Sequence, residues 1–164
     1  MELFIIRHGI AQERGSVNDA DRALTSIGRR KTAVVAEGLS KLGCRPACIG
    51  TSSLRRAEET ARIMAEVLCP DVPVDICEFL EPGGDPVDLV DWLREHGEES
   101  VMIVGHMPDV AEAASVFLAG RNDVEMVFKK AAVCCIEFDG VPAAGSGRLR
   151  WLMQPRQLRH SSQA

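Results

Sequence analysis

The chain begins with a short apolar run, residues 3–6, that ends abruptly at Arg7 and His8. A fully apolar run of this length is typical of a strand buried on both faces of a parallel sheet. Gly9 follows, and the chain can turn there because glycine accepts backbone angles that other residues avoid. A guanidinium and an imidazole are therefore presented at the carboxyl end of a strand, where open α/β sheets bind ligands. This pair suits an anion, since the imidazole can act as nucleophile or acid and the guanidinium can clamp oxyanions.

The rest of the chain alternates between helical and strand patterns. Apolar residues at helical spacing predict helices over 25–42, 54–68, 86–96 and 108–119. Thr25 is the expected N-cap of the first helix, and Ser52 or Ser53 that of the second. Short apolar runs predict strands at 47–51, 72–76, 101–104, 131–138 and 147–153. This order, βαβαβαβα and then two strands, predicts a three-layer α/β/α fold with a mainly parallel central sheet.

Length and composition narrow the class of protein. With 164 residues we expect a single domain over 1–155, followed by a polar, poorly ordered tail over 156–164. The net charge of −5 argues against a nucleic-acid-binding surface, which needs a basic face. No apolar run is long enough to span a membrane, and residues 3–6 are too short for a signal peptide. We therefore expect a cytoplasmic monomer that binds neither nucleic acid nor membrane.

The six cysteines form no C-x-x-C pair, and the chain has no matching pair of histidines. The sequence therefore predicts no zinc site. Cys134 and Cys135 lie within an apolar run, so we expect them to be small core residues.

Three predicted strand ends carry unusual polar groups: 7–9, 52–57 and 105–108. A doubly wound sheet can bring all three to one carboxyl edge. Two histidines and several arginines would then meet beside two helix N-termini, near Ser53 and Pro108, which add partial positive charge. Such a pocket suits a dianion, and phosphate is the natural candidate.

These segments, taken in order, resemble the histidine phosphatase (phosphoglycerate mutase-like) superfamily, and within it the short SixA-type phosphohistidine phosphatases. The matching stretches are 3–11, 22–28, 52–61, 80–85 and 104–108. The resemblance implies a phosphatase that uses neither metal nor cofactor and passes the phosphoryl group through His8. His8 must be neutral to attack, and its other ring nitrogen should donate to a backbone carbonyl.

The resemblance also assigns roles to other residues. Arg7 and Arg56 would hold the oxygens of the transferring group, and His106 would donate a hydrogen bond to them. Arg56 fits better than Arg55 because the family arginine directly precedes an alanine, and the role of Arg55 stays open. The remaining candidates for substrate binding are Gly9, Arg22, Ser52 and Gly105.

The general acid is the least defined part of the predicted site. Glu78 and Glu81 lie in the right region, but neither sits in a clear acid motif. Imidazole leaves more easily than an alkoxide, so hydrolysis of phosphohistidine needs less help from an acid. The short chain also lacks the insertions that roof the pocket in larger members. Both features favour a phosphorylated protein as substrate, such as a histidine-containing phosphotransfer domain.

Two alternatives remain open. A small-molecule phosphomonoesterase would act on a phosphate ester and use Glu78 or Glu81 as its acid. A non-catalytic module that binds a phosphorylated ligand is the other alternative. The presence of both histidines and both key arginines argues against it, because binding alone needs no nucleophile.

Overall fold

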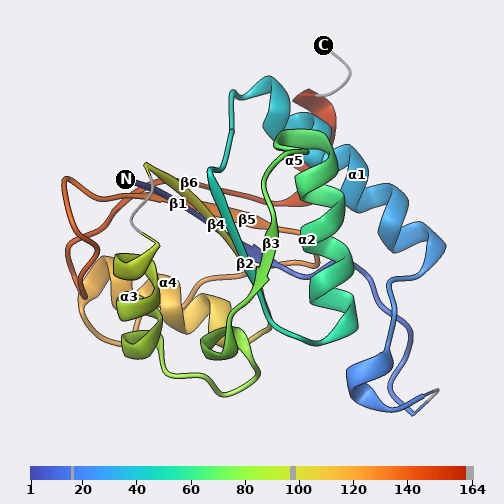
Figure 1. Cartoon of the computed structure of the whole chain (residues 1–164), viewed down its shortest axis with the longest axis horizontal. Coiled ribbons are helices and arrows are strands. Elements are labelled where there is room, and N and C mark those ends of the chain that lie inside the picture. Colours follow the sequence, from blue (N-terminus) through green and yellow to red (C-terminus); the bar gives the residue numbers. More distant parts are fainter. Residues whose placement is uncertain (16, 97–98, 162–164) are drawn as a thin grey trace.

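A six-stranded sheet lies between two layers of helices in the computed structural model, which describes residues 1–15, 17–96 and 99–161 (Figure 1). The strands are β1 (Glu2–Arg7), β2 (Cys48–Thr51), β3 (Val74–Ile76), β4 (Ser100–Gly105), β5 (Val133–Glu137) and β6 (Arg148–Met153). They lie in the order β3-β2-β4-β1-β5-β6. The first four strands in this order are parallel neighbours, whereas β5 runs antiparallel to both β1 and β6. The predicted three-layer α/β fold with a mainly parallel sheet is confirmed.

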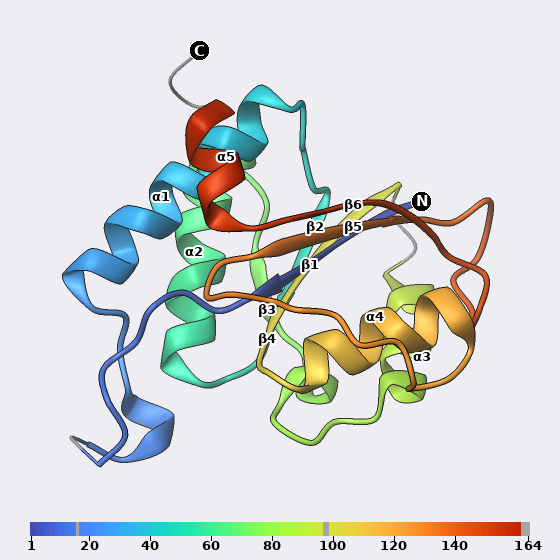
Figure 2. The same ribbon diagram turned by 180° about the vertical axis from the view of Figure 1, so that it is seen from behind.

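The helices divide between the two faces of the sheet (Figures 1 and 2). One face carries α1 (Ser26–Lys41), α2 (Arg55–Leu68) and α5 (Pro155–Ser161), and the other carries α3 (Pro86–Glu95) and α4 (Asp109–Ala119). Two short 3-10 helices, η1 (Asp19–Asp21) and η2 (Glu78–Leu80), lie in the connections. The elements follow the predicted order, with α5 in addition.

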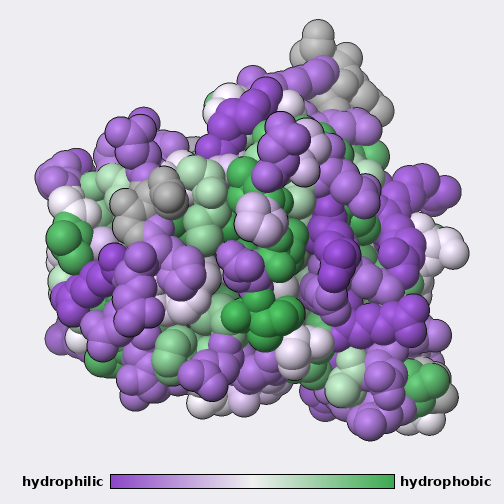
Figure 3. All heavy atoms as spheres, viewed as in Figure 1, coloured by the Kyte–Doolittle hydropathy of each residue, from purple (hydrophilic) through white to green (hydrophobic). Residues whose placement is uncertain are grey.

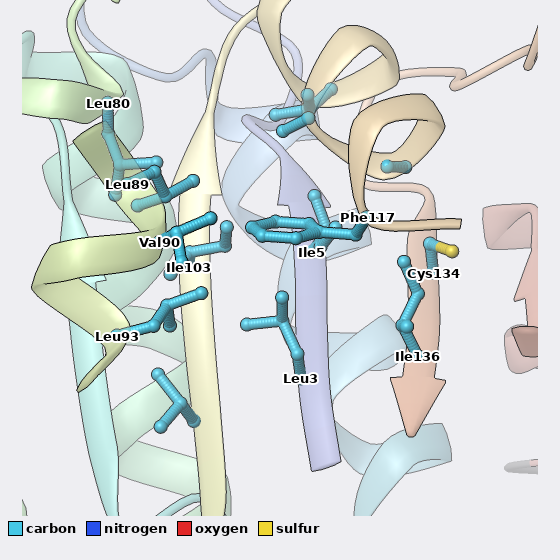
Figure 4. Close-up of a cluster of buried hydrophobic side chains, with 14 of the residues drawn as sticks. Leu3, Ile5, Leu80, Leu89, Val90, Leu93, Ile103, Phe117, Cys134 and Ile136 are labelled. Atoms are coloured by element: carbon cyan, nitrogen blue, oxygen red, sulfur yellow. The ribbon is translucent and has the colours of Figure 1, made fainter. Parts of the chain in front are cut away.

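Alternate residues of each central strand fill the two hydrophobic layers. In β1, Ile5 packs towards α3 and α4, as Figure 4 shows, whereas Phe4 packs towards α1 and α2. The neighbouring cysteines of β5 divide in the same way, with Cys134 in the first layer and Cys135 in the second. Burial raises the pKa of each of these two thiols to about 12, so both stay protonated. They are core residues, as the sequence predicts.

The helix caps confirm one prediction and correct another. Thr25 caps α1, because its hydroxyl accepts a hydrogen bond from the backbone N–H of Gly28 at 2.9 Å. The N-cap of α2 is Leu54, which makes no side-chain cap, so the prediction of Ser52 or Ser53 as cap is wrong. The hydroxyl of Ser52 lies against His106 instead.

The predicted tail is largely helical, which corrects the expectation of a poorly ordered segment from residue 156. Residues 155–161 form α5, and the side chain of Leu158 is fully buried against α1 and α2. The backbone of α5 approaches α1 closely at Gly38, where a Cβ would lie 2.4 Å from the carbonyl oxygen of Leu158. Burial of the apolar Leu158 side chain favours docking of a segment whose composition is otherwise polar. Residues 162–164 lie outside the described part of the chain.

Hydrophobic surface gathers over β3, the edge of the sheet, on the face shown in Figure 3, where Ile76 is exposed. Polar and charged residues cover most of the rest of that face. Within the described residues, no helix is both long and apolar enough to cross a membrane.

We predict that Leu158→Ala lowers the free energy of unfolding by about 2–5 kcal/mol, the usual cost of emptying a buried leucine site. The control is Leu149→Ala, since Leu149 is 49% exposed on β6. Leu149→Ala should lower the free energy of unfolding by less than about 1 kcal/mol. Urea unfolding of the two variants measures both, and an equal loss in the two would contradict the docking of α5.

Candidate active site

Strand register brings the three predicted segments to one edge of the sheet. Arg7 of β1 lies opposite Gly105 of β4, and Thr51 of β2 lies opposite Val104 of the same strand. The backbone N–H of His8 donates to the carbonyl of Gly105 at 3.0 Å. A pocket of about 360 Å³ opens at this edge, lined by Arg7, His8, Arg14, Asp19, Arg22, Arg56, Pro82, His106, Met107 and Lys130. The four predicted catalytic residues therefore share one pocket.

The imidazole of His8 is held in one orientation by its own turn. Its Nδ1 lies 2.8 Å from the carbonyl oxygen of Gly9, which can only accept a hydrogen bond. Nδ1 therefore carries the proton, and Nε2 presents a lone pair, as the sequence analysis expects. The N–H of Gly9 is in turn held by the hydroxyl of Thr60 at 3.0 Å. Gly9 also allows close packing, because a Cβ there would lie 2.5 Å from the hydroxyl of Thr32.

Burial keeps His8 neutral. Desolvation first, then the positive charge of Lys130 and the neighbouring His106, lower the pKa of His8 to about 2. The side chain is only 4% exposed. His8 is therefore a neutral imidazole throughout the physiological range, which is the state a nitrogen nucleophile needs.

Lys130 is a member of the site that sequence reasoning missed. Its Nζ lies 3.1 Å from Nε2 of His8, so the ammonium donates a hydrogen bond to this ring nitrogen. The N–H of Ala131 holds this lysine in place by donating to the carbonyls of Arg7 and His8. Desolvation, followed by the charges of Arg7 and Arg56, lowers the pKa of Lys130 to about 8.

One signal in the sequence could have located Lys130. It directly precedes the predicted strand 131–138, and an antiparallel pairing of that strand with β1 places its beginning beside the end of β1. The predicted order of elements does not show which strand pairs with β1. The sequence alone therefore does not predict that Lys130 lies beside His8.

The arginines of the pocket are organised by one carboxylate, that of Asp19. Arg56 donates to the carbonyl of Asp19 at 2.7 Å and to its Oδ2 at 3.1 Å, while Arg22 donates from Nε to Oδ1 at 2.9 Å. Burial acts to raise the pKa of Asp19, but attraction to Arg56 and Arg22 outweighs it, so the pKa is lowered and the group stays ionised. Arg7 is anchored separately, by a 2.6 Å hydrogen bond to the carbonyl of Phe128.

His106 faces His8 across the pocket, with ring centroids 5.1 Å apart. Its Nε2 lies 2.6 Å from the hydroxyl of Ser52. Ser52 does not line the pocket, and it contacts the site through His106. Desolvation, and then the charge of Arg56, lower the pKa of His106 to about 4, so this ring is also neutral near pH 7.

Three polar atoms of the site have no hydrogen-bond partner within the described chain although they are buried: Nε of Arg7, Nε of Arg56 and Nδ1 of His106. Buried polar groups in folded proteins are nearly always satisfied. Their concentration in the three residues predicted to hold phosphate indicates a site prepared for an external acceptor such as an oxyanion.

The remaining candidates lie around the pocket rather than in its lining. The carboxylate of Glu81 accepts a hydrogen bond from the backbone N–H of Ser53 at 2.5 Å, and Glu78 is exposed on η2. Arg55 pairs with Glu59 at 3.0 Å and is exposed, so it does not share the role of Arg56. Gly105 is a support for His8, because its carbonyl accepts the N–H of His8.

We predict that acid destabilises the protein through His8. The pKa of His8 is about 2 in the folded chain, whereas an unperturbed histidine, as in the unfolded chain, has a pKa of 6.5. Between pH 6.5 and about pH 2 the unfolded chain therefore binds a proton at His8 that the folded chain does not bind. Stability should therefore fall as the pH drops below 6.5, and His8→Gln should weaken this loss. Urea unfolding between pH 7 and pH 5 measures it, with His96→Gln, outside the pocket, as control. An unchanged pH dependence in His8→Gln would contradict a neutral, buried His8.

Comparison with known proteins agrees with this geometry. The model of the histidine phosphatase superfamily (branch 1) matches residues 3–81. An uncharacterised protein of Picosynechococcus sp. is 35% identical over 137 residues, which cover 81% of this chain and 82% of that protein. A phosphohistidine phosphatase SixA homolog of Haemophilus influenzae is 28% identical over 150 residues, covering 85% and 90%.

A solved structure extends the similarity over nearly the whole chain. The protein histidine phosphatase SixA complexed with tungstate superposes with a TM-score of 0.85 at 25% identity, covering 96% of this chain and 99% of that one. The chain therefore belongs to the histidine phosphatase superfamily, and its similarity to SixA supports phosphatase activity.

Proposed function

We propose that this protein hydrolyses phosphohistidine on another protein, through a phosphoryl group carried by Nε2 of His8. The observation that supports this most directly is the state of His8, a neutral imidazole with Nδ1 bound to a carbonyl and Nε2 facing the cations of the pocket. A module that only binds phosphate has no use for an unprotonated nitrogen in that position. The similar protein of Haemophilus influenzae is named a phosphohistidine phosphatase SixA homolog, and the similar solved structure is that of the protein histidine phosphatase SixA.

In the first step, the lone pair of Nε2 attacks phosphorus and the P–N bond of the substrate breaks. The electron pair of that bond returns to the substrate imidazole, which leaves. In the second step, a water oxygen attacks phosphorus of phospho-His8, the proton of the water passes to bulk solvent, and the electron pair of the P–N bond returns to Nε2. Inorganic phosphate and the neutral imidazole of His8 result, so the site is restored.

The pocket stabilises the charge of the transferring group. Arg7 and Arg56 present guanidinium groups that can bind its oxygens, and His106 presents Nδ1 as a further donor when the Ser52 hydroxyl donates to Nε2. Each well-placed donor of this kind contributes roughly 3–4 kcal/mol to the transition state. Lys130 adds a fourth group next to the nucleophile, and its ammonium can move from Nε2 to a phosphoryl oxygen as the phosphoryl group arrives.

The absence of a suitable acid favours phosphohistidine over a phosphate ester. Among the described residues, Asp19 is the only carboxylate that lines the pocket, and its pKa is lowered by Arg56 and Arg22. An ionised, doubly paired carboxylate cannot protonate an alkoxide. A protonated phosphoimidazole releases a neutral imidazole and needs no such proton, so the small-molecule phosphomonoesterase is less well supported.

We predict that His8→Ala lowers kcat/KM for a phosphohistidine-containing phosphotransfer domain by about 10³-fold or more, the scale on which removing a nucleophile acts. Arg56→Ala should lower it by about 10²–10³-fold through lost charge stabilisation. Release of inorganic phosphate measures both, and Arg55→Ala, one residue away and exposed, is the matched control.

The same assay with a panel of phosphomonoesters separates the alternatives. Faster turnover of an alkyl phosphate, lost in Glu81→Gln or Glu78→Gln, would assign the protein to small-molecule phosphomonoesters. Binding of phosphate without turnover of any substrate would support the alternative of a non-catalytic module that binds a phosphorylated ligand.

We predict that kcat/KM falls as the pH rises through about 8, because this parameter reports the free enzyme and Lys130 loses its proton there. In Lys130→Ala the fall in kcat/KM near pH 8 should disappear. The value of kcat/KM below pH 8 should be about 10-fold or more lower than that of wild type. Lys130→Arg, whose side chain stays charged, should remain active at pH 9. A fall near pH 8 that persists in Lys130→Ala would exclude Lys130 as its origin.

A further inference from the structure

A second concave surface adjoins the catalytic pocket, and we call it the basic groove. It has a volume of about 350 Å³ and is lined by Ile10, Gly28, Lys31, Thr32, Lys129, Lys130, Ala131, Gln154, Pro155, Arg156 and Arg159. These residues come from the chain after β1, from α1, from the segment before β5 and from the start of α5. Figure 2 shows α1 and α5 next to each other on this side of the sheet.

The charge of the basic groove is opposite to that of the molecule. Five of its lining residues are lysine or arginine, and none of those described is aspartate or glutamate, whereas the chain carries a net charge of −5. The lining also includes apolar residues, among them Ile10, Ala131 and Pro155. A surface of this kind is complementary to a polypeptide that carries acidic side chains interspersed with apolar ones.

The basic groove and the catalytic pocket share Lys130, whose Nζ contacts Nε2 of His8. Ile10, at the near end of the groove, is only two residues beyond His8. Because the two concave surfaces share a residue that contacts His8, a phosphorylated side chain on a polypeptide bound in the groove would lie near the catalytic pocket.

One wall of the groove is fixed by hydrogen bonds of Gln154. The side-chain oxygen of Gln154 accepts the N–H of Lys129 at 3.1 Å, and its amide donates to the carbonyl of Val127 at 2.6 Å. These contacts tie the segment before β5 to the start of α5. Because the backbone of this wall is already ordered, binding a partner there loses less conformational entropy.

We propose that the basic groove binds an acidic segment of the phosphoprotein substrate, next to its phosphorylated histidine. This inference rests on the proposed function and names the substrate feature that the same site recognises. The cations come from three separate parts of the chain, α1, the segment before β5 and α5, and apolar residues line the groove with them, which suits an acidic polypeptide segment better than one small anion. The attraction acts between partly exposed charges, so it weakens with salt.

The first test compares two substrates in one set of variants. The double variant Lys31→Glu/Arg156→Glu reverses two charges of the groove, and Arg30→Glu reverses an exposed charge on α1 outside it. The ratio of kcat/KM for a phosphotransfer domain with an acidic flank to kcat/KM for free phosphohistidine should fall about 10-fold in the double variant, mainly through KM. Arg30→Glu should leave the ratio as in wild type. An unchanged ratio in the double variant would overturn the inference.

The second test needs no turnover and so separates this inference from the proposed function. A fluorescein-labelled peptide of alternating glutamate and leucine is titrated with each protein at low salt, and fluorescence anisotropy reports binding. Binding to wild type and Arg30→Glu that is lost in the double variant supports the groove, even if phosphohistidine is not hydrolysed and the proposed function fails. Equal binding by all three proteins, or no binding by wild type, overturns the groove even if the proposed function holds.

Discussion

The hydrogen bond from Nδ1 of His8 to the carbonyl of Gly9 is the interaction on which the proposed chemistry depends. It selects the tautomer, directs the lone pair of Nε2 towards the pocket, and is possible only because the chain turns directly after β1. That turn is held by Thr60 of α2 and packed against Thr32 of α1, so two helices support the position of His8. Burial of the same ring keeps it neutral in the presence of several cations. The fold therefore supplies orientation and protonation state together.

The second constraint is the balance of charge in the pocket. Arg7, Arg56 and Lys130 would repel one another, and Asp19 offsets part of this repulsion by pairing with Arg56 and Arg22. Because Asp19 remains ionised, it orients the guanidinium groups and does not act as an acid. The same positive surface continues through Lys130 into the basic groove. Lys130 thus lines both the catalytic pocket and the basic groove, which is the surface proposed to select the substrate.

Much of this arrangement follows from sequence patterns, and the exceptions have physical reasons. The apolar runs before His8 and His106 predict strand ends at one sheet edge, which placed Arg7, His8, Arg56 and His106 correctly in one pocket. The sequence does not predict Lys130 as a site residue, because its contact with His8, 122 positions away in the chain, depends on the antiparallel pairing of β5 with β1. The polar composition of the tail predicts disorder, whereas the structure forms a helix there and buries its leucine, Leu158, against α1 and α2.

The central claim is that the phosphoryl group passes through His8, and trapping it there is the most direct test. The protein would be mixed with a phosphotransfer domain carrying radiolabelled phosphohistidine, quenched with alkali within a fraction of a turnover, and separated from its substrate. The account predicts label on this chain that is stable to alkali, labile to acid, located on His8 by peptide mapping, and missing in His8→Ala. Label on another residue, or phosphate release by wild type with no labelled protein at any quench time, would contradict it.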